Sequence, residues 1–322
     1  MIHAQKTLGS RVLFARRPRG CSTVPIAIYT HASGTTDVGR RRDTNQDTFF
    51  IDEGLGLFLV ADGMGGRQGG GVASKLVVQT ISSVLRRHLD HDAPAPDPNE
   101  PLLLNDGEDT HLAKRGRLLK GAFLASNRAV FEKSTKHPAL RGMGSTAAAV
   151  LLDNDMLEVA NVGDSPIYLA RNGEIHLISV VHTVEAEHAA KIASGELDPD
   201  SPPLDRRYRH VLTRAVGVAP TLKVQMRKVQ IQDGDILLLC SDGLSNKLDP
   251  DEMLPVVTQH EPAAACRELV DMANERGGED NICVIVVRLR AMETETHEEE
   301  EDDGFRVKPS IFTIMGRLLG KG

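Results

Sequence analysis

The chain has 322 residues, and 40% of them are apolar, which is enough for a sizeable hydrophobic core in one large domain or two ordinary ones. Its net charge is -7, and residues 31–290 alone hold 29 basic against 37 acidic residues. This acidic balance argues against nucleic acid as a partner, because a phosphate backbone attracts positive charge. No stretch approaches the roughly 18 apolar residues that a transmembrane segment needs.

The first 30 residues contain five Lys and Arg, no acidic residue and no continuous apolar segment of the kind that export signals carry. We predict a disordered basic leader over 1–30, with an organellar transit sequence as the alternative. The four cysteines form no CxxC pair, and two of them lie inside apolar runs. This pattern favours buried free thiols in a reducing compartment and therefore a cytoplasmic protein.

Short apolar and β-branched runs predict a series of strands. They occupy 47–53, 55–62, 145–153, 156–164, 166–170, 174–179, 224–231, 235–242 and 281–289. Several neighbours are joined only by tight-turn residues, such as Asp153-Asn154-Asp155 and Arg171-Asn172-Gly173. Such short connections indicate antiparallel pairing, because a parallel crossover needs a long connection, usually a helix.

Helical periodicity is present in three segments, 69–89, 111–133 and 262–276, the last opened by Pro262 and followed by Gly277-Gly278. The Pro- and acid-rich segment between the first two helices is typical of a mobile surface loop. Many strands with few, clustered helices predict an α+β domain over 31–290, with helices layered on antiparallel sheets.

The last segment, 291–322, begins as an acidic tether and ends in apolar residues at amphipathic helical spacing, with basic residues nearby. Two alternatives are open for this tail. It either docks on a partner or a membrane surface as a short helix, or it is frayed.

Four predicted strands begin or end at an aspartate: Asp62, Asp164, Asp242 and Asp280. Any one of these residues is more simply a turn residue. Packed sheets, however, bring strand ends to a common edge, where four carboxylates about 5 Å apart would repel by about 20 kcal/mol at an effective dielectric near 20. Protonation, basic partners or cations must compensate. Because neither His nor Cys directly adjoins any of the four aspartates in the sequence, the site favours Mg²⁺ or Mn²⁺ over zinc.

The chain resembles the metal-dependent protein phosphatases of the 2C type, in their bacterial-like branch. The resemblance covers nearly all of 31–290 and rests on seven motifs in the family's order: GTTDVGRRRDTNQDTFF, LFLVADGMGG, GMGSTAAAVLL, VANVGDSPIYL, HVLTRAVG, LLLCSDGLSNKL and GGEDNICVIVV. It implies a four-layer α-β-β-α sandwich of two antiparallel sheets flanked by helices, with a metal centre at one edge of the sheets.

The resemblance also implies a role for individual residues. Asp62 corresponds to the carboxylate that bridges two Mn²⁺ or Mg²⁺ ions, and the Gly63 carbonyl binds one of them. Asp242 and Asp280 correspond to ligands of the second ion, and Asp47 to the acid that holds metal-bound waters. Asp164 corresponds to a ligand of a weaker third ion.

Arg42 corresponds to the family arginine that binds the substrate phosphate, which suits its forked guanidinium. The implied reaction is hydrolysis of phosphoserine and phosphothreonine by a metal-bridging hydroxide that attacks phosphorus in line. The glycines after Asp62 are expected to give the backbone room to approach the metals. Met64 stands where many eukaryotic members have a His proposed as the acid for the leaving group, and Pro166 and Val181 also depart from the common pattern.

The leading prediction is therefore a protein serine/threonine phosphatase that acts on phosphorylated proteins, kinases or their substrates among them. Two alternatives are a catalytically weak pseudophosphatase that binds phosphoproteins and a two-metal hydrolase of another class, such as a nuclease.

Overall fold

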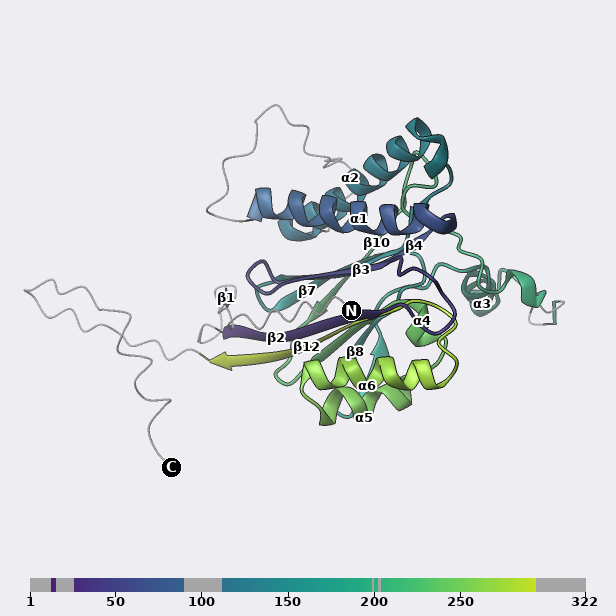
Figure 1. Cartoon of the computed structure of the whole chain (residues 1–322). Helices are drawn as coiled ribbons and strands as arrows, with labels where there is room; N and C mark the ends of the chain where they lie inside the picture. The colour runs from purple at the N-terminus through teal and green to yellow at the C-terminus, as the bar shows by residue number, and fades with distance from the viewer. Residues whose placement is uncertain (1–12, 16–25, 90–111, 199, 202–203, 294–322) are drawn as a thin grey trace, which may run out of the picture.

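Two antiparallel sheets lie face to face in the computed structural model of the chain, which describes residues 13–15, 26–89, 112–198, 200–201 and 204–293 (Figure 1). The first sheet has the strand order β1 (Leu13–Ala15), β2 (Ile26–Asp37), β12 (Ile282–Glu293), β11 (Ile236–Cys240), β8 (Ile167–Arg171) and β9 (Glu174–Leu177). The second has the order β10 (Gln225–Gln230), β7 (Met156–Val162), β6 (Ala147–Asp153), β4 (Leu57–Met64) and β3 (Asp47–Asp52), with β5 (Gly144–Ser145) also paired to β4.

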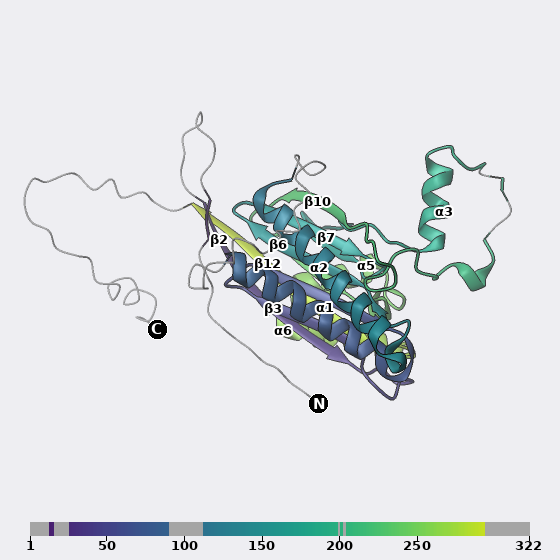
Figure 2. The ribbon, with the colours of Figure 1, turned by 90° about the horizontal axis from the view of Figure 1, so that it is seen from above.

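Helices cover the outer face of each sheet. α1 (Gly66–Leu89) and α2 (Lys114–Lys136) pack on the second sheet, whereas α5 (Pro250–Gln259) and α6 (Pro262–Glu275) pack on the first (Figure 1). The short α4 (Asp242–Ser245) follows β11 directly. α3 (Val184–Ala193) projects away from the sheets, and none of its residues is buried (Figure 2). Two 3₁₀ turns complete the elements, η1 (Pro138–Leu140) and η2 (Arg206–Tyr208).

Three buried apolar layers hold the sandwich together, one between the sheets and one under each helix pair. Leu57, Leu59 and Ala61 of β4 face α1 and α2, while Phe58 and Val60 face the other sheet. This alternation follows from the period of two residues along a strand. All five side chains are buried because both faces of β4 are covered, which explains why the run reads as continuously apolar.

The predicted hairpins are present. β6 and β7 are joined at Asn154, with φ 57°, and β8 and β9 at Asn172, with φ 53°, and both pairs are antiparallel. Asn tolerates the left-handed conformation that such two-residue turns require, so the turn residues alone specify these connections.

The structure also differs from the sequence prediction. α3 and α5 were not predicted, because ten residues give little periodicity and Pro255 interrupts α5. A capping box at Asp249 and Glu252 is the local signal that marks the start of α5. The first sheet begins earlier than the predicted boundary at 31, since β2 starts at Ile26 and pairs with β1 inside the predicted leader. The predicted loop at 90–110 and the tail at 294–322 lie outside the described residues.

Candidate metal centre

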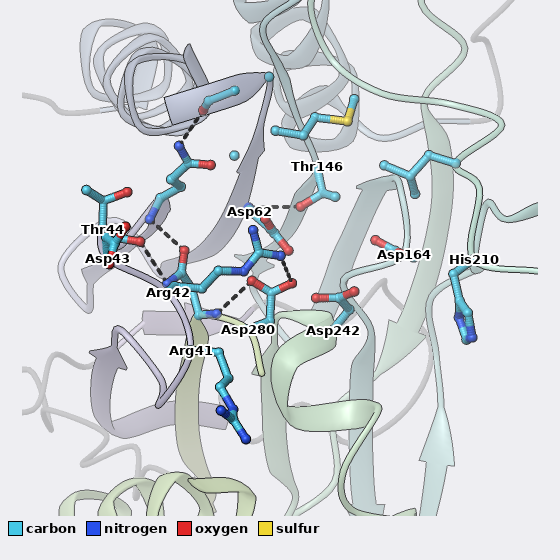
Figure 3. Close-up of a pocket in the computed structure, with 17 residues that line it drawn as sticks. Arg41, Arg42, Asp43, Thr44, Asp62, Thr146, Asp164, His210, Asp242 and Asp280 are labelled. Atoms are coloured by element: carbon cyan, nitrogen blue, oxygen red, sulfur yellow. Dashed lines mark hydrogen bonds and ion pairs between the residues drawn. The ribbon is translucent and has the colours of Figure 1, made fainter. Parts of the chain in front are cut away.

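A pocket of about 800 Å³ opens at one edge of the sandwich, and five aspartates line it. Besides Asp43 they are Asp62, Asp164, Asp242 and Asp280, whose carboxylates gather around the centre of the pocket in Figure 3. The convergence predicted from the strand ends is therefore present. Arg42, Gly63 and Met64 line the same pocket, whereas Asp47, which is 7% exposed, is not among the lining residues.

Strand pairing explains why these residues meet. Asp62 of β4 lies directly opposite Asp47 of β3 in the antiparallel register. β11 and β12 are antiparallel neighbours, so the end of β11, which leads into Asp242, lies beside the start of β12, which follows Asp280. Asp164 lies in the turn between β7 and β8. Five positions spread over more than two hundred residues thus reach one rim of two sheets.

Asn281 fixes the loop that precedes β3. Its Oδ1 accepts the backbone N–H of Gln46 at 2.9 Å, and its Nδ2 donates to the carbonyls of Val38 at 2.9 Å and Thr44 at 3.0 Å. Because Asn281 is buried beside Asp280, these bonds hold the loop that carries Arg42 against the start of β12.

Burial dominates the electrostatics of the carboxylates. It raises the pKa of Asp47 to about 7, with further contributions from the charges of Asp242 and Asp280, although the nearby Ser241 hydroxyl and Asp62 favour the ionised form of Asp47. Neither oxygen of Asp47 has a hydrogen bond of ordinary geometry within the described part of the chain. The pKa of Asp62 lies well above its usual range, first because of burial and next because of Asp47.

The pKa values of Asp164 and Asp242 are shifted in the same direction. Burial raises the pKa of Asp164 to about 7, and the charge of Asp242 adds to this effect. Burial and the charge of Asp280 raise the pKa of Asp242, whose Oδ1 is likewise buried without a hydrogen-bond partner among the described residues. Buried carboxylate oxygens without donors form an all-oxygen set of the kind that hard divalent cations prefer, so these residues fit Mg²⁺ or Mn²⁺.

The side chains share the pocket without yet enclosing an ion. Within the described ranges, no three Asp, Glu, His or Cys side chains are arranged closely enough to hold a metal as they stand. Side-chain rotamers adjust on binding more readily than strand ends move. The shared pocket and the mutual electrostatic effects of the carboxylates therefore still support a metal site here.

Arg42 forms an ion pair with Asp280, one of the predicted metal ligands. Its Nη2 donates to Asp280 Oδ2 at 2.7 Å and its Nε to the Glu279 carbonyl at 3.3 Å, and the ion pair is half exposed. The predicted phosphate ligand and a predicted metal ligand are thus bound to each other. Such a pair is worth little for stability at this exposure.

The glycines that follow Asp62 are also required by packing, whereas their role toward a metal stays a prediction. A Cβ on Gly63 would collide with the Gly70 carbonyl at the start of α1, and a Cβ on Gly65 would lie 2.6 Å from Met143 Cα. Close packing of the chain on itself therefore already demands glycine at both positions, without any metal.

Thr146 and His210 are among the residues that line the pocket but were not singled out from the sequence. Thr146 belongs to the quoted GMGSTAAAVLL run, but its role depends on hydrogen bonds that no spacing shows. His210 lies on the same side of the pocket as Asp164, opposite Arg41 and Arg42 (Figure 3). It stands alone in an irregular segment, which gives no periodic signal.

Residues 206–209, with the sequence Arg-Arg-Tyr-Arg, form a basic run between α3 and β10, and part of its charge is paired. Arg207 binds Asp205 at 2.6 Å, and Arg209 lies 3.6 Å from Glu185 of α3. At least two of its charges are therefore paired within the segment that carries α3.

Two facing antiparallel sheets with a carboxylate-lined pocket at one edge are the features of a divalent-metal hydrolase. The family model described as protein phosphatase 2C matches residues 38–276, and the chain belongs to this family.

Individual relatives agree with this assignment. The serine/threonine phosphatase stp of Listeria welshimeri is 30% identical over 267 residues, which are 82% of this chain and 97% of that protein. The solved structure of the Mycobacterium tuberculosis serine/threonine phosphatase PstP/Ppp is 30% identical with a TM-score of 0.64, covering 80% of this chain and 98% of that one. The catalytic domain of PstP in complex with two manganese ions is 29% identical with a TM-score of 0.64, covering 82% and 99%.

Family membership confirms the predicted fold class, the predicted protein serine/threonine phosphatase activity and the predicted dependence on Mn²⁺ or Mg²⁺. The roles of individual site residues and the domain boundaries stay predictions. No helix among the described residues is long and apolar enough to cross a membrane.

Proposed function

We propose that the chain removes phosphate from phosphoserine and phosphothreonine in other proteins at this pocket, with two divalent ions held there by Asp62, the Gly63 carbonyl, Asp242 and Asp280. Asp47 would hold water at this pair of ions, and Asp164 would contribute to a weaker third ion. The observation that carries the proposal is that Asp62, Asp164, Asp242 and Asp280 line one pocket, with Asp47 paired directly opposite Asp62. Among the described residues, Asp47 and Asp242 also have buried carboxylate oxygens that lack donors.

The protein's own residues prepare the site for a doubly charged phosphate ester. A pair of divalent cations supplies positive charge and a water of lowered pKa in such a site. Asp47 and Asp62, paired across β3 and β4, present their carboxylates from a rigid sheet rather than from a loop. Arg42 adds the directional donors that a phosphoryl group needs.

The proposed activity is tested with p-nitrophenyl phosphate and with matched phosphoserine, phosphothreonine and phosphotyrosine peptides, with added Mn²⁺ or with EDTA. Mn²⁺-dependent hydrolysis of the first two peptides is expected. Binding of phosphopeptides without turnover would favour the pseudophosphatase alternative, and cleavage of nucleic acid would favour the nuclease alternative.

We predict that Arg42→Ala mainly raises the KM for p-nitrophenyl phosphate, by about 10- to 100-fold, because charge-assisted hydrogen bonds to the phosphate are lost. Steady-state kinetics at saturating Mn²⁺ measures this effect. Arg128→Ala, which removes an exposed arginine that pairs with Glu132 on α2, is the matched control. An unchanged KM in the Arg42 variant would count against its role in binding phosphate.

The tail at 294–322 and a cytoplasmic location also remain part of the proposal. The basic and apolar residues of the tail suit a docking role on a partner or a membrane surface. Because β12 continues to Glu293, a truncation that preserves the sheet ends after this residue. The truncated chain should hydrolyse p-nitrophenyl phosphate normally and lose a binding partner or membrane association that the full chain shows in pull-down or vesicle sedimentation.

A further inference from the structure

Thr146, between β5 and β6, connects the backbone of Asp62 to the turn that carries Asp164. It is 2% exposed, and its Oγ1 accepts the backbone N–H of Asp62 at 2.9 Å. In return, the Thr146 N–H donates to the Asp62 carbonyl at 2.8 Å. Asp62 is therefore held by both the backbone and the side chain of one buried residue.

The same hydroxyl reaches the other side of the pocket. Thr146 Oγ1 lies 2.7 Å from Ser165 Oγ, and Ser165, which directly follows Asp164, is 2% exposed. Because Thr146 Oγ1 already accepts the Asp62 N–H, its own hydrogen is available to Ser165. A single buried hydroxyl thus joins the backbone at Asp62 to the residue next to Asp164.

The turn that carries Asp164 is fixed from its other end as well. Gly163, at φ 99°, packs against Thr146 so closely that a Cβ would lie 2.6 Å from Thr146 Cγ2. The Gly163 N–H donates to Nδ1 of the buried His182 at 3.1 Å, and the Gly163 carbonyl accepts the His182 N–H at 3.0 Å. The turn is therefore clamped between His182 and Thr146.

We infer that Thr146 is a positioning residue that holds Asp62 and Asp164 at a fixed separation and so strengthens metal binding at the pocket. The inference rests on the proposed function. Carboxylates gathered at low exposure repel one another, and a stiff connection between their backbones helps to keep them together before an ion arrives. Hydrogen bonds that support metal ligands in this way typically change metal affinity by about 10- to 100-fold.

Two substitutions distinguish the contribution of the Thr146 hydroxyl from that of its methyl group. Thr146→Val keeps the volume and the contact with Gly163 but removes both hydroxyl hydrogen bonds, whereas Thr146→Ser keeps the hydroxyl. Isothermal titration calorimetry with Mn²⁺ on the full chain should show binding weakened about tenfold or more in Thr146→Val. Thr146→Ser should keep the Mn²⁺ affinity within about threefold of the wild type, since the supporting hydrogen bonds persist.

Thr48→Val is the matched control. Thr48 lies on β3 with its Oγ1 3.0 Å from Ser74 Oγ, so the substitution also breaks a partly buried hydroxyl pair, but one that contacts neither Asp62 nor the Asp164 turn. Its Mn²⁺ affinity should equal that of the wild type. The thermal midpoint in EDTA, measured for every variant, reports any loss of folding separately from loss of metal affinity.

Ser165→Ala provides a second route if Thr146→Val does not fold. It removes the other hydroxyl of the pair and leaves the bond to the Asp62 N–H intact, so Mn²⁺ binding should weaken about threefold or more. Wild-type Mn²⁺ affinity in a folded Thr146→Val, or in Ser165→Ala, overturns the inference, as does equal weakening in Thr146→Ser. A wild-type chain that binds no Mn²⁺ and hydrolyses no p-nitrophenyl phosphate overturns the proposed function itself.

Discussion

Replacing Asp62 by Asn is expected to lower Mn²⁺-dependent hydrolysis of p-nitrophenyl phosphate by more than about a hundredfold and to raise the thermal midpoint of the metal-free protein. Asp62 faces Asp47 across the β3–β4 pair, and burial and the Asp47 charge both raise its pKa. An amide has nearly the same shape but carries no charge, so the variant loses a metal ligand and at the same time loses repulsion within the rim.

The measurement combines steady-state rates with thermal unfolding in EDTA. Relief of repulsion on the order of 1–3 kcal/mol corresponds to a rise of several degrees in a domain of this size. Asp271→Asn, at an exposed position on α6, is the charge-matched control and should change neither quantity. Activity within a few-fold of the wild type in Asp62→Asn would refute the proposed metal assignment, whatever the change in stability.

The metal-free protein is expected to lose stability as pH rises from about 5 to about 8. The pKa values of Asp47 and Asp164 are each about 7 in the folded chain, and burial also raises the pKa values of Asp62 and Asp242. Their usual values lie near 4. Between these limits the folded state binds more protons than the unfolded state. The contribution of these carboxyl groups to stability is therefore fully present below pH 4 and is lost as pH rises through 7.

Thermal midpoints measured in EDTA across this range test the expectation. The combined effect should reach several kcal/mol, since one pKa unit corresponds to about 1.4 kcal/mol. Saturating Mn²⁺ should reverse the trend, because the metal binds the deprotonated carboxylates and competes with protons. A midpoint in EDTA that stays level or rises between pH 5 and pH 8 would contradict the raised pKa values on which the fit to a divalent cation partly depends.

The ion pair between Arg42 and Asp280 connects these predictions to substrate binding. A carboxylate that binds a metal ion attracts a guanidinium less strongly, so a metal ion would compete with Arg42 for Asp280. The phosphate of a substrate would bind the same guanidinium. If Asp280 binds a metal as proposed, its attraction for Arg42 would weaken and the guanidinium would be more available to the phosphate. The KM effect of Arg42→Ala is accordingly best measured with the metal at saturation.

The sequence alone specified the local elements and the family. Apolar runs and the turn residues around Asn154 and Asn172 predicted the hairpins, because such turns depend on only a few adjacent residues. The short motifs identified the family because they occur in its order along one chain. The three helices that escaped prediction, α3, α4 and α5, are too short for a periodic pattern to stand out.

Only the tertiary structure decided how the site is assembled. That Asp62, Asp164, Asp242 and Asp280 reach one pocket depends on the pairing order of strands far apart in the chain. The sequence predicted their convergence as a hypothesis, but neither the pairing of Arg42 with Asp280 nor the support of Asp62 by Thr146 follows from residue spacing. Both contacts join segments more than eighty residues apart, and hydrogen bonds of that range exist only once the two sheets have packed and set the distance between their edges.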